Sequence, residues 1–173
     1  HLAGVEQSAA DFVPAWRDTP KAAITLRHLL SMTSGLGFAR ERSVLMPAGV
    51  DAQARMAEAP LEHPPGTRWV YHTPAYRMLA RIVEDAVGEP LADYQARRLF
   101  GPAGMNHTAW DTLPAPNGRT NYLFMRSSVP DMARFGLLIL RRGNWNGTQL
   151  VSEAYVAEST RRSQDLNPSY GYL

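Results

Sequence analysis

The stretch that most constrains this chain is residues 64–74, which joins a stiff turn to the start of a helix. Two prolines with locked φ angles, followed by Gly66, fix a tight turn. Trp69-Val70-Tyr71 is aromatic and β-branched, which favours a short extended segment. Thr73-Pro74 has the pattern of an N-cap followed by the first residue of a helix. We therefore expect the phenol of Tyr71 to lie on a rigid backbone beside a helix N-terminus.

Two roles for Tyr71 stay open on the residues alone. A tyrosine beside a tryptophan usually packs in the core with its hydroxyl hydrogen-bonded. A phenolate base at neutral pH needs about 4 kcal/mol of stabilisation instead, because tyrosine has a pKa near about 10. A helix N-terminus supplies at most about 1 kcal/mol of this. A catalytic Tyr71 therefore requires a nearby cation, for which Arg68, His72 and Arg77 are the neighbours in sequence.

Composition excludes several classes of function. The 173 residues are 45% hydrophobic and 20% charged, which is typical of a globular chain with one core. Cysteine is absent, and His28, His63, His72 and His107 lack the spacing of a metal site, so we predict neither a metal nor a cofactor. A net charge of +2 with dispersed arginines argues against nucleic-acid binding. No apolar run approaches the length of about 18 residues that a membrane span requires. The compartment, cytoplasmic or periplasmic, stays open.

Helical patterns dominate the chain, and strand-like runs are scarce. Thr25 is predicted to cap a helix that ends in a left-handed conformation at Gly35. Further helices are predicted over residues 50–59, 74–87, 90–100, 132–142 and 152–160. Asn146-Gly147 predicts a hairpin. Residues 37–49 are predicted to form a loop that covers a cleft, and residues 101–125 a long irregular loop.

Both ends of the chain are unusual. It opens at His1 without an initiator methionine or signal peptide, and it closes on an aromatic run over residues 167–173. Natural termini are usually exposed and polar. We therefore expect residues 1–173 to be a single partial domain taken from the interior of a longer protein.

Three blocks of sequence resemble the serine β-lactamase-like superfamily, in the right order. Residues 24–36 resemble the segment that follows the nucleophile helix of that family. Residues 65–71 resemble the Pro-Gly approach to its Tyr-x-Asn motif, and residues 128–147 resemble a later helix and its Gly-x-Trp-x-Gly turn. The blocks span nearly the whole chain and are most similar to class C β-lactamases and their esterase and nylon-oligomer hydrolase relatives.

The resemblance implies a mostly α chain, the helical domain of an α+β serine β-lactamase-like fold whose main antiparallel sheet lies largely outside this chain. The family's Ser-x-x-Lys and Lys/His-Thr-Gly motifs are absent here, as expected for a fragment, and the only lysine is Lys21. Tyr71 matches the catalytic tyrosine, and the missing lysine would be the cation it needs. Thr73 stands where the motif has asparagine, so it is a candidate substrate contact, with a plain N-cap role as the alternative.

The activity that the resemblance implies is acyl transfer. We expect the complete protein to hydrolyse carboxylic esters or small amides through an acyl-serine, with Tyr71 as general base and proton relay. We expect the isolated chain to be inactive, to need the remaining segments of the same protein, and to expose an apolar face where the sheet belongs. The alternatives are a penicillin-binding-like or β-lactamase activity, or a catalytically dead helical binding module.

Overall fold

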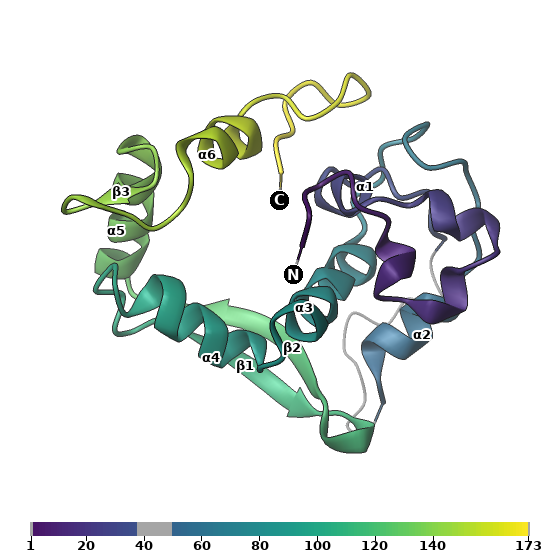
Figure 1. Ribbon diagram of the computed structural model, residues 1–173, viewed down its shortest axis with the longest axis horizontal. Coiled ribbons are helices and arrows are strands. Elements are labelled where there is room, and N and C mark those ends of the chain that lie inside the picture. The colour runs from purple at the N-terminus through teal and green to yellow at the C-terminus, as the bar shows by residue number, and fades with distance from the viewer. Residues whose placement is uncertain (1, 38–49, 173) are drawn as a thin grey trace.

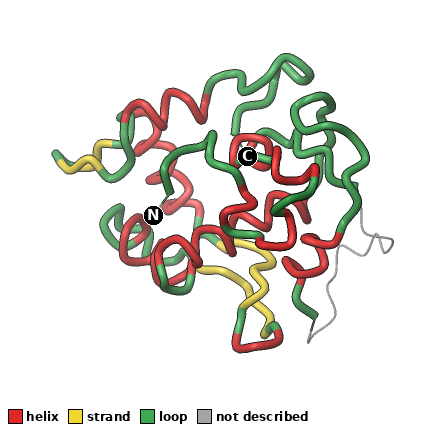
Figure 2. The backbone as a smooth tube through the Cα atoms, turned by 45° about the vertical axis from the view of Figure 1, so that its right-hand side comes forward, coloured by secondary structure: helices red, strands yellow, loops and turns green. Residues whose placement is uncertain are grey.

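The structure, a computed structural model, describes residues 2–37 and 50–172 (Figure 1). Its helices are α1 (Leu26–Leu30), α2 (Ala52–Glu58), α3 (Thr73–Val87), α4 (Leu91–Gln95), α5 (Val129–Leu140) and α6 (Glu153–Thr160). Strands β1 (Ala109–Pro114) and β2 (Thr120–Arg126) form one antiparallel pair, and β3 (Asn144–Trp145) and β4 (Thr148–Gln149) form another. Short helical turns are η1 (Ala9–Asp11), η2 (Pro14–Trp16), η3 (Pro20–Ala23), η4 (Ala96–Phe100) and η5 (Pro116–Gly118). Figure 2 shows that helix far exceeds strand among the regular elements, as the sequence predicts.

Helix α3 occupies the centre of the molecule, with α1 and α2 on one side and α4 with the β1–β2 pair on the other (Figure 1). Its apolar residues recur every three or four positions, which gives one face for burial. Ala75, Met78 and Ile82 on that face join the main core, where Trp16 and Ile24 are fully buried. The helix that follows the Pro64–Pro65 turn is therefore anchored in the main core.

Helix α1 ends earlier than predicted. The left-handed residue after the helix is Met32, with φ 60°, and the prediction of Gly35 as this cap is wrong. The Thr33 N–H donates to the His28 carbonyl at 2.9 Å, which closes a Schellman motif around Met32. Gly35 is needed for another reason, because a Cβ there would lie 2.0 Å from the His63 carbonyl oxygen.

The prediction of an irregular loop over residues 101–125 is also wrong. Residues 109–114 and 120–125 of this stretch lie in β1 and β2, which are joined through η5 and paired antiparallel with one bulge. Trp110 of β1 packs edge-on against Tyr122 of β2, with ring centroids 5.5 Å apart. The Trp110 indole N–H donates to Gln95 of α4 at 2.7 Å, so the hairpin is fixed to the helices as well as to itself.

Local capping residues mark the starts of the remaining helices, although α5 begins at Val129, before the predicted residue 132. Asp51, Ser128 and Ser152 cap α2, α5 and α6 through their side-chain oxygens. Asn146 and Gly147 both have positive φ and join β3 to β4 as predicted. The predicted helix over residues 90–100 is α4 continued by η4, a single π-helical turn. Of the predicted loop over residues 37–49, all but Gly37 lies outside the described residues.

Helix α5 has two apolar faces. Leu138 on one face is fully buried, whereas Val129 and Leu140 on the other are 83% and 81% exposed, and Met132 and Phe135 beside them are exposed too. A helix that is apolar all round is normally covered all round. Neither α5 nor any other helix of the described residues combines the length and apolarity needed to cross a membrane.

Candidate active site

The Tyr71 side chain lies on a short irregular segment tied to the end of α1. The Val70 N–H donates to the Met32 carbonyl at 3.0 Å, and the His72 N–H points to the Met32 sulfur at 3.4 Å. Residues 69–71, predicted as a short extended segment, pair with no strand among the described residues, yet the backbone on both sides of Tyr71 is fixed. The Tyr71 side chain is 59% exposed and has no hydrogen-bond partner within residues 2–37 and 50–172.

His72, not Thr73, is the N-cap of α3. The His72 Nδ1 accepts the Ala75 N–H at 3.1 Å, and its Nε2–H donates to the Gly37 carbonyl at 3.2 Å. Burial lowers the pKa of His72, which agrees with the neutral ring that these two bonds require. The prediction of Thr73 as the cap is therefore wrong. Thr73 is the first residue of α3, half-buried and close to Tyr71 in the chain.

The cations predicted from sequence are engaged elsewhere. An Arg68 Nη1 lies 3.0 Å from the His63 Nε2. An Arg77 Nη2 donates to the Leu123 carbonyl at 2.7 Å, and its guanidinium lies over the ring of Phe124. With His72 neutral, the part of the chain that the structure describes places no ion-pairing cation at the Tyr71 phenol. Within the same residues, no group of three or more histidines and carboxylates could hold a metal ion.

An aromatic cluster lies beside Tyr71, and it includes a residue that the sequence did not indicate. The rings of Trp69 and Tyr170 meet edge to face, with centroids 5.3 Å apart and an interplanar angle of 66°. Burial raises the pKa of Tyr170, and the charges of the Tyr71 and Tyr76 phenols raise it further. The Trp69 indole N–H is buried without a partner among the described residues.

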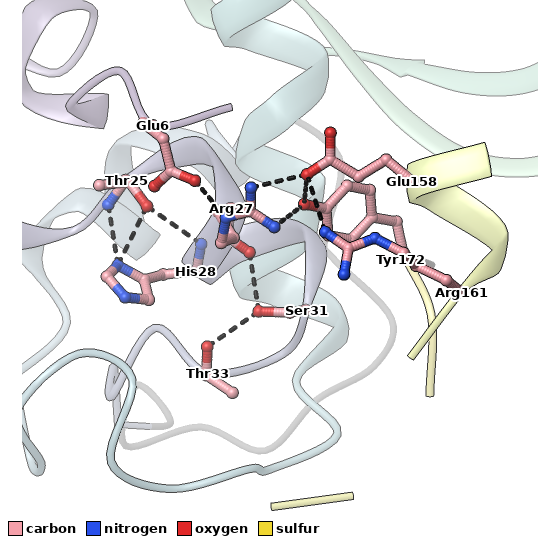
Figure 3. Close-up of polar contacts among 9 residues, drawn as sticks. All are labelled: Glu6, Thr25, Arg27, His28, Ser31, Thr33, Glu158, Arg161 and Tyr172. Carbon is pink, nitrogen blue, oxygen red and sulfur yellow. Dashed lines mark hydrogen bonds and ion pairs between the residues drawn. The ribbon is translucent and has the colours of Figure 1, made fainter. Parts of the chain in front are cut away.

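Arg27 of α1 joins segments from the two ends of the chain (Figure 3). Its guanidinium contacts Glu6 and the hydroxyl of Tyr172, and it donates to the Glu158 carboxylate at 2.6 Å. The Tyr172 hydroxyl donates to the same carboxylate at 3.0 Å. The hydrogen bond from Arg27 is the main cause that lowers the pKa of Glu158. This network fixes α6 and the segment after it to α1.

A cavity of about 180 Å³ lies on the other side of the Tyr71 segment. Val70 and His72 line it, together with Glu62, His63 and Arg68, but Tyr71 does not. Side chains on either side of Tyr71 therefore face this cavity, while the phenol points to the surface. The cavity is not the place where a substrate would meet Tyr71.

Known proteins share both the sequence pattern and the fold. A family model described as Beta-lactamase matches residues 4–171. Penicillin-binding protein 4* of Bacillus subtilis (strain 168) is 32% identical over 115 residues, which cover 62% of this chain and 25% of that relative. A protein of Bacteroides dorei DSM 17855 assigned as a β-lactamase has 21% identity and a TM-score of 0.79, over 92% of this chain and 49% of its own.

D-amino acid amidase of Ochrobactrum anthropi SV3 shares the fold at lower similarity, with 20% identity and a TM-score of 0.68 over 92% of this chain and 52% of the amidase. The chain thus spans a quarter of the curated relative and about half of these two structures. The family match runs through every described helix and strand. The chain therefore belongs to the beta-lactamase family and forms a mostly helical part of its fold.

Proposed function

We propose that the complete protein is a serine hydrolase that cleaves carboxylic esters or small amides through an acyl-serine intermediate, with Tyr71 as its general base. The observation that supports this most is the Tyr71 side chain, which is exposed on a backbone fixed at both neighbours by Met32. A phenol used only for packing would be buried. An exposed phenol on a fixed backbone is suited to proton transfer to a bound substrate.

In this reaction the serine oxygen attacks the substrate carbonyl while its proton passes to the Tyr71 oxygen. Tyr71 then gives the proton to the departing alcohol or amine, and water releases the acyl group. The nucleophile and its lysine belong to a part of the complete protein outside this chain, which has no Ser-x-x-Lys. Lys21 does not supply the cation, because its Nζ donates to the Ala57 carbonyl at 2.9 Å beside α2.

Thr73 fits an ester or small-amide substrate. It replaces the asparagine of the family motif, and because His72 already caps α3, the hydroxyl of Thr73 is not required as the cap. We propose that it contacts the substrate. A hydroxyl donates and accepts through one atom, whereas an asparagine amide offers two donors on its nitrogen and a separate carbonyl acceptor. Thr73 would therefore make fewer hydrogen bonds to the side chain of a β-lactam than asparagine does.

A Tyr71→Phe substitution in the complete protein tests this role. Turnover of a p-nitrophenyl ester should fall by at least about 10²-fold, because a positioned general base contributes that much. Tyr94→Phe on α4, away from the aromatic cluster, is the matched control and should retain activity. Since the Tyr71 hydroxyl has no partner in the described residues, the thermal midpoint of the isolated chain should not change, and a loss of activity in the complete protein would report on chemistry. Near-normal turnover would remove Tyr71 from the mechanism.

A second function is favoured by the relative in Bacillus subtilis, which is named a penicillin-binding protein. The serine of such a protein would be acylated by a β-lactam, and the acyl-enzyme would be hydrolysed slowly. Burst kinetics with a chromogenic β-lactam separate the two, because a stoichiometric burst without steady turnover indicates penicillin binding. If neither an ester, an amide nor a β-lactam reacts, the chain belongs to a catalytically dead binding module.

A further inference from the structure

Tyr170 is brought to Tyr71 from the far end of the chain. Its ring meets Trp69, two residues before Tyr71, in the edge-to-face contact that aromatic pairs prefer. Tyr170 is half-buried, so one part of the ring packs on the indole while another part stays open to solvent. Nothing in the chemistry proposed above uses this residue.

The backbone of Tyr170 is held on both sides. Its carbonyl accepts the N–H and the hydroxyl of Ser163 at 3.0 and 2.9 Å, and its own N–H donates to the Asn167 carbonyl at 3.1 Å. These bonds fold residues 163–170 into a closed turn that presents the tyrosine.

The next anchor follows almost at once along the chain. The Tyr172 N–H donates to the Ser159 carbonyl at 2.9 Å, and its hydroxyl lies between Arg27 and Glu158 (Figure 3). Tyr170 therefore lies between a closed turn and an ionic anchor on α1, and its ring has little freedom to leave Trp69.

We propose that Tyr170 is a substrate-positioning residue, an inference that rests on the proposed function. Its ring and that of Trp69 form an aromatic surface beside the Tyr71 phenol. This surface binds a flat, ring-bearing group of an ester or amide substrate. The Arg27–Glu158–Tyr172 network holds this surface in place. Such a surface favours aryl over short alkyl substrates, because the aromatic ring of a substrate stacks on it, whereas a methyl or ethyl group covers little of it.

The test compares ring-bearing and alkyl esters in the complete protein. For Tyr170→Ala, the KM for benzyl acetate and ethyl phenylacetate should rise about 3- to 10-fold, the range expected for one aromatic contact. The kcat values should stay within about twofold of wild type, since the proton relay is untouched. The KM for ethyl acetate should not change. Tyr170→Phe keeps the ring and should restore the wild-type KM, while Tyr94→Ala serves as the control.

The anchor gives a second variant with a graded effect. Tyr172→Phe removes only the hydroxyl that contacts Arg27 and Glu158, and it should raise the KM for the ring-bearing esters in the same direction but less. A rise in KM that is equal for aryl and alkyl esters, or a parallel fall in kcat, would show a structural role and overturn the inference.

A binding measurement keeps this test separate from that of the proposed function. The quenching of tryptophan fluorescence by phenylacetate, compared with acetate, reports on the aromatic surface without turnover. If the wild-type protein hydrolyses no ester, the proposed function fails, and the surface is still judged by whether Tyr170→Ala weakens phenylacetate binding about 3- to 10-fold. Equal binding of phenylacetate by wild type and Tyr170→Ala would overturn the inference even if hydrolysis is normal.

Discussion

The His72 N–H lies 3.4 Å from the sulfur of Met32, so the residue that follows Tyr71 is tied to the end of α1. The Met32 carbonyl also accepts the Val70 N–H, on the other side of Tyr71. Met32 is buried and has the left-handed φ that ends α1. Met32 therefore ends α1 and also fixes the backbone on both sides of Tyr71, the candidate catalytic residue.

Substitutions at Met32 separate its burial from its backbone conformation. Met32→Gly relieves the left-handed φ, which costs a non-glycine residue about 1 kcal/mol. It also removes a buried side chain, for which truncation costs about 2–5 kcal/mol. Burial should win, so Met32→Gly and Met32→Ala should both lower the free energy of unfolding in urea. Met32→Leu keeps the volume and should cost less than about 1.5 kcal/mol. A Met32→Gly variant more stable than wild type would show that backbone strain dominates.

The stability of the fold should fall on mild acidification because two capping histidines are held neutral. Burial lowers the pKa of His72 and that of His28, whose Nδ1 accepts the Thr25 N–H at 3.1 Å at the start of α1. Above about pH 7 both residues are neutral in the folded and unfolded chain and contribute no pH dependence. As the pH falls below about 6.5, the unfolded chain binds protons first, so the free energy of unfolding decreases.

Two substitutions at His72 distinguish this titration from the loss of a cap. Asparagine also caps helices but does not titrate, so His72→Asn should reduce the drop in thermal midpoint between pH 7.5 and 5.5. Alanine cannot cap, so His72→Ala should lose about 1 kcal/mol at pH 7.5 as well. If His72→Asn leaves the drop unchanged, His72 is not one of the titrating groups.

Sequence predicts best where the deciding interaction is local. Ser128 and Ser152 cap helices through a bond three residues away, and Asn146-Gly147 forms its hairpin from its own φ angles. The cap of α3 was missed because two adjacent residues could each accept the bond, and burial of His72 against Gly37 decided between them.

Long-range contacts explain the other errors. The pair β1–β2 is fixed to α4 by the Trp110 bond to Gln95, which no local pattern reports, although Tyr122 and Phe124 in alternation were a signal for strand. Tyr71 could be found by motif. Tyr170 could not, because its position depends on Arg27 and the folding of α6 onto α1. The candidate site is thus half predictable from local sequence and half a product of the fold.

Among the carboxylates of the second half of the chain, Asp131 should be the one whose substitution lowers the stability of the fold most. It is fully buried and accepts the His107 N–H at 2.7 Å, the Thr108 hydroxyl at 3.0 Å and an Arg134 Nη1 at 3.1 Å. Burial alone would raise the pKa of Asp131, but these donors hold it below its ordinary value. Its contribution to stability is therefore present at neutral pH and is lost as the pH falls through that lowered pKa.

Asp131→Asn should accordingly lower the urea midpoint at pH 7, because an amide brings two donors to a site built of donors. The difference from wild type should begin to shrink below about pH 4, where the unfolded wild-type chain takes up a proton at Asp131 before the folded chain does. Asp165→Asn is the matched control, since the Asp165 side chain is 92% exposed and forms a surface ion pair with Arg162, and its midpoint should not move. Equal midpoints for all three proteins at pH 7 would contradict this account.

The exposed face of α5 should make the isolated chain self-associate. Met132 and Leu140 lie on it, two helical turns apart, while Leu138 on the opposite face is buried. A Met132→Gln/Leu140→Gln double variant keeps good helix formers and should raise the monomer fraction in sedimentation velocity. The single variant Leu138→Gln should instead unfold the chain.

The same double variant tests whether the exposed face of α5 is buried in the complete protein. If the remaining segments bury this face, each buried apolar side chain contributes about 1.5–3 kcal/mol, so the two glutamines should lower the stability of the complete protein markedly. They should then destabilise the complete protein while improving the solubility of the isolated chain. If the face were exposed in the complete protein as well, the two glutamines would improve the solubility of both proteins and would destabilise neither. A loss of stability in the complete protein together with a gain of solubility in the isolated chain would therefore identify α5 as the surface on which the rest of the fold packs.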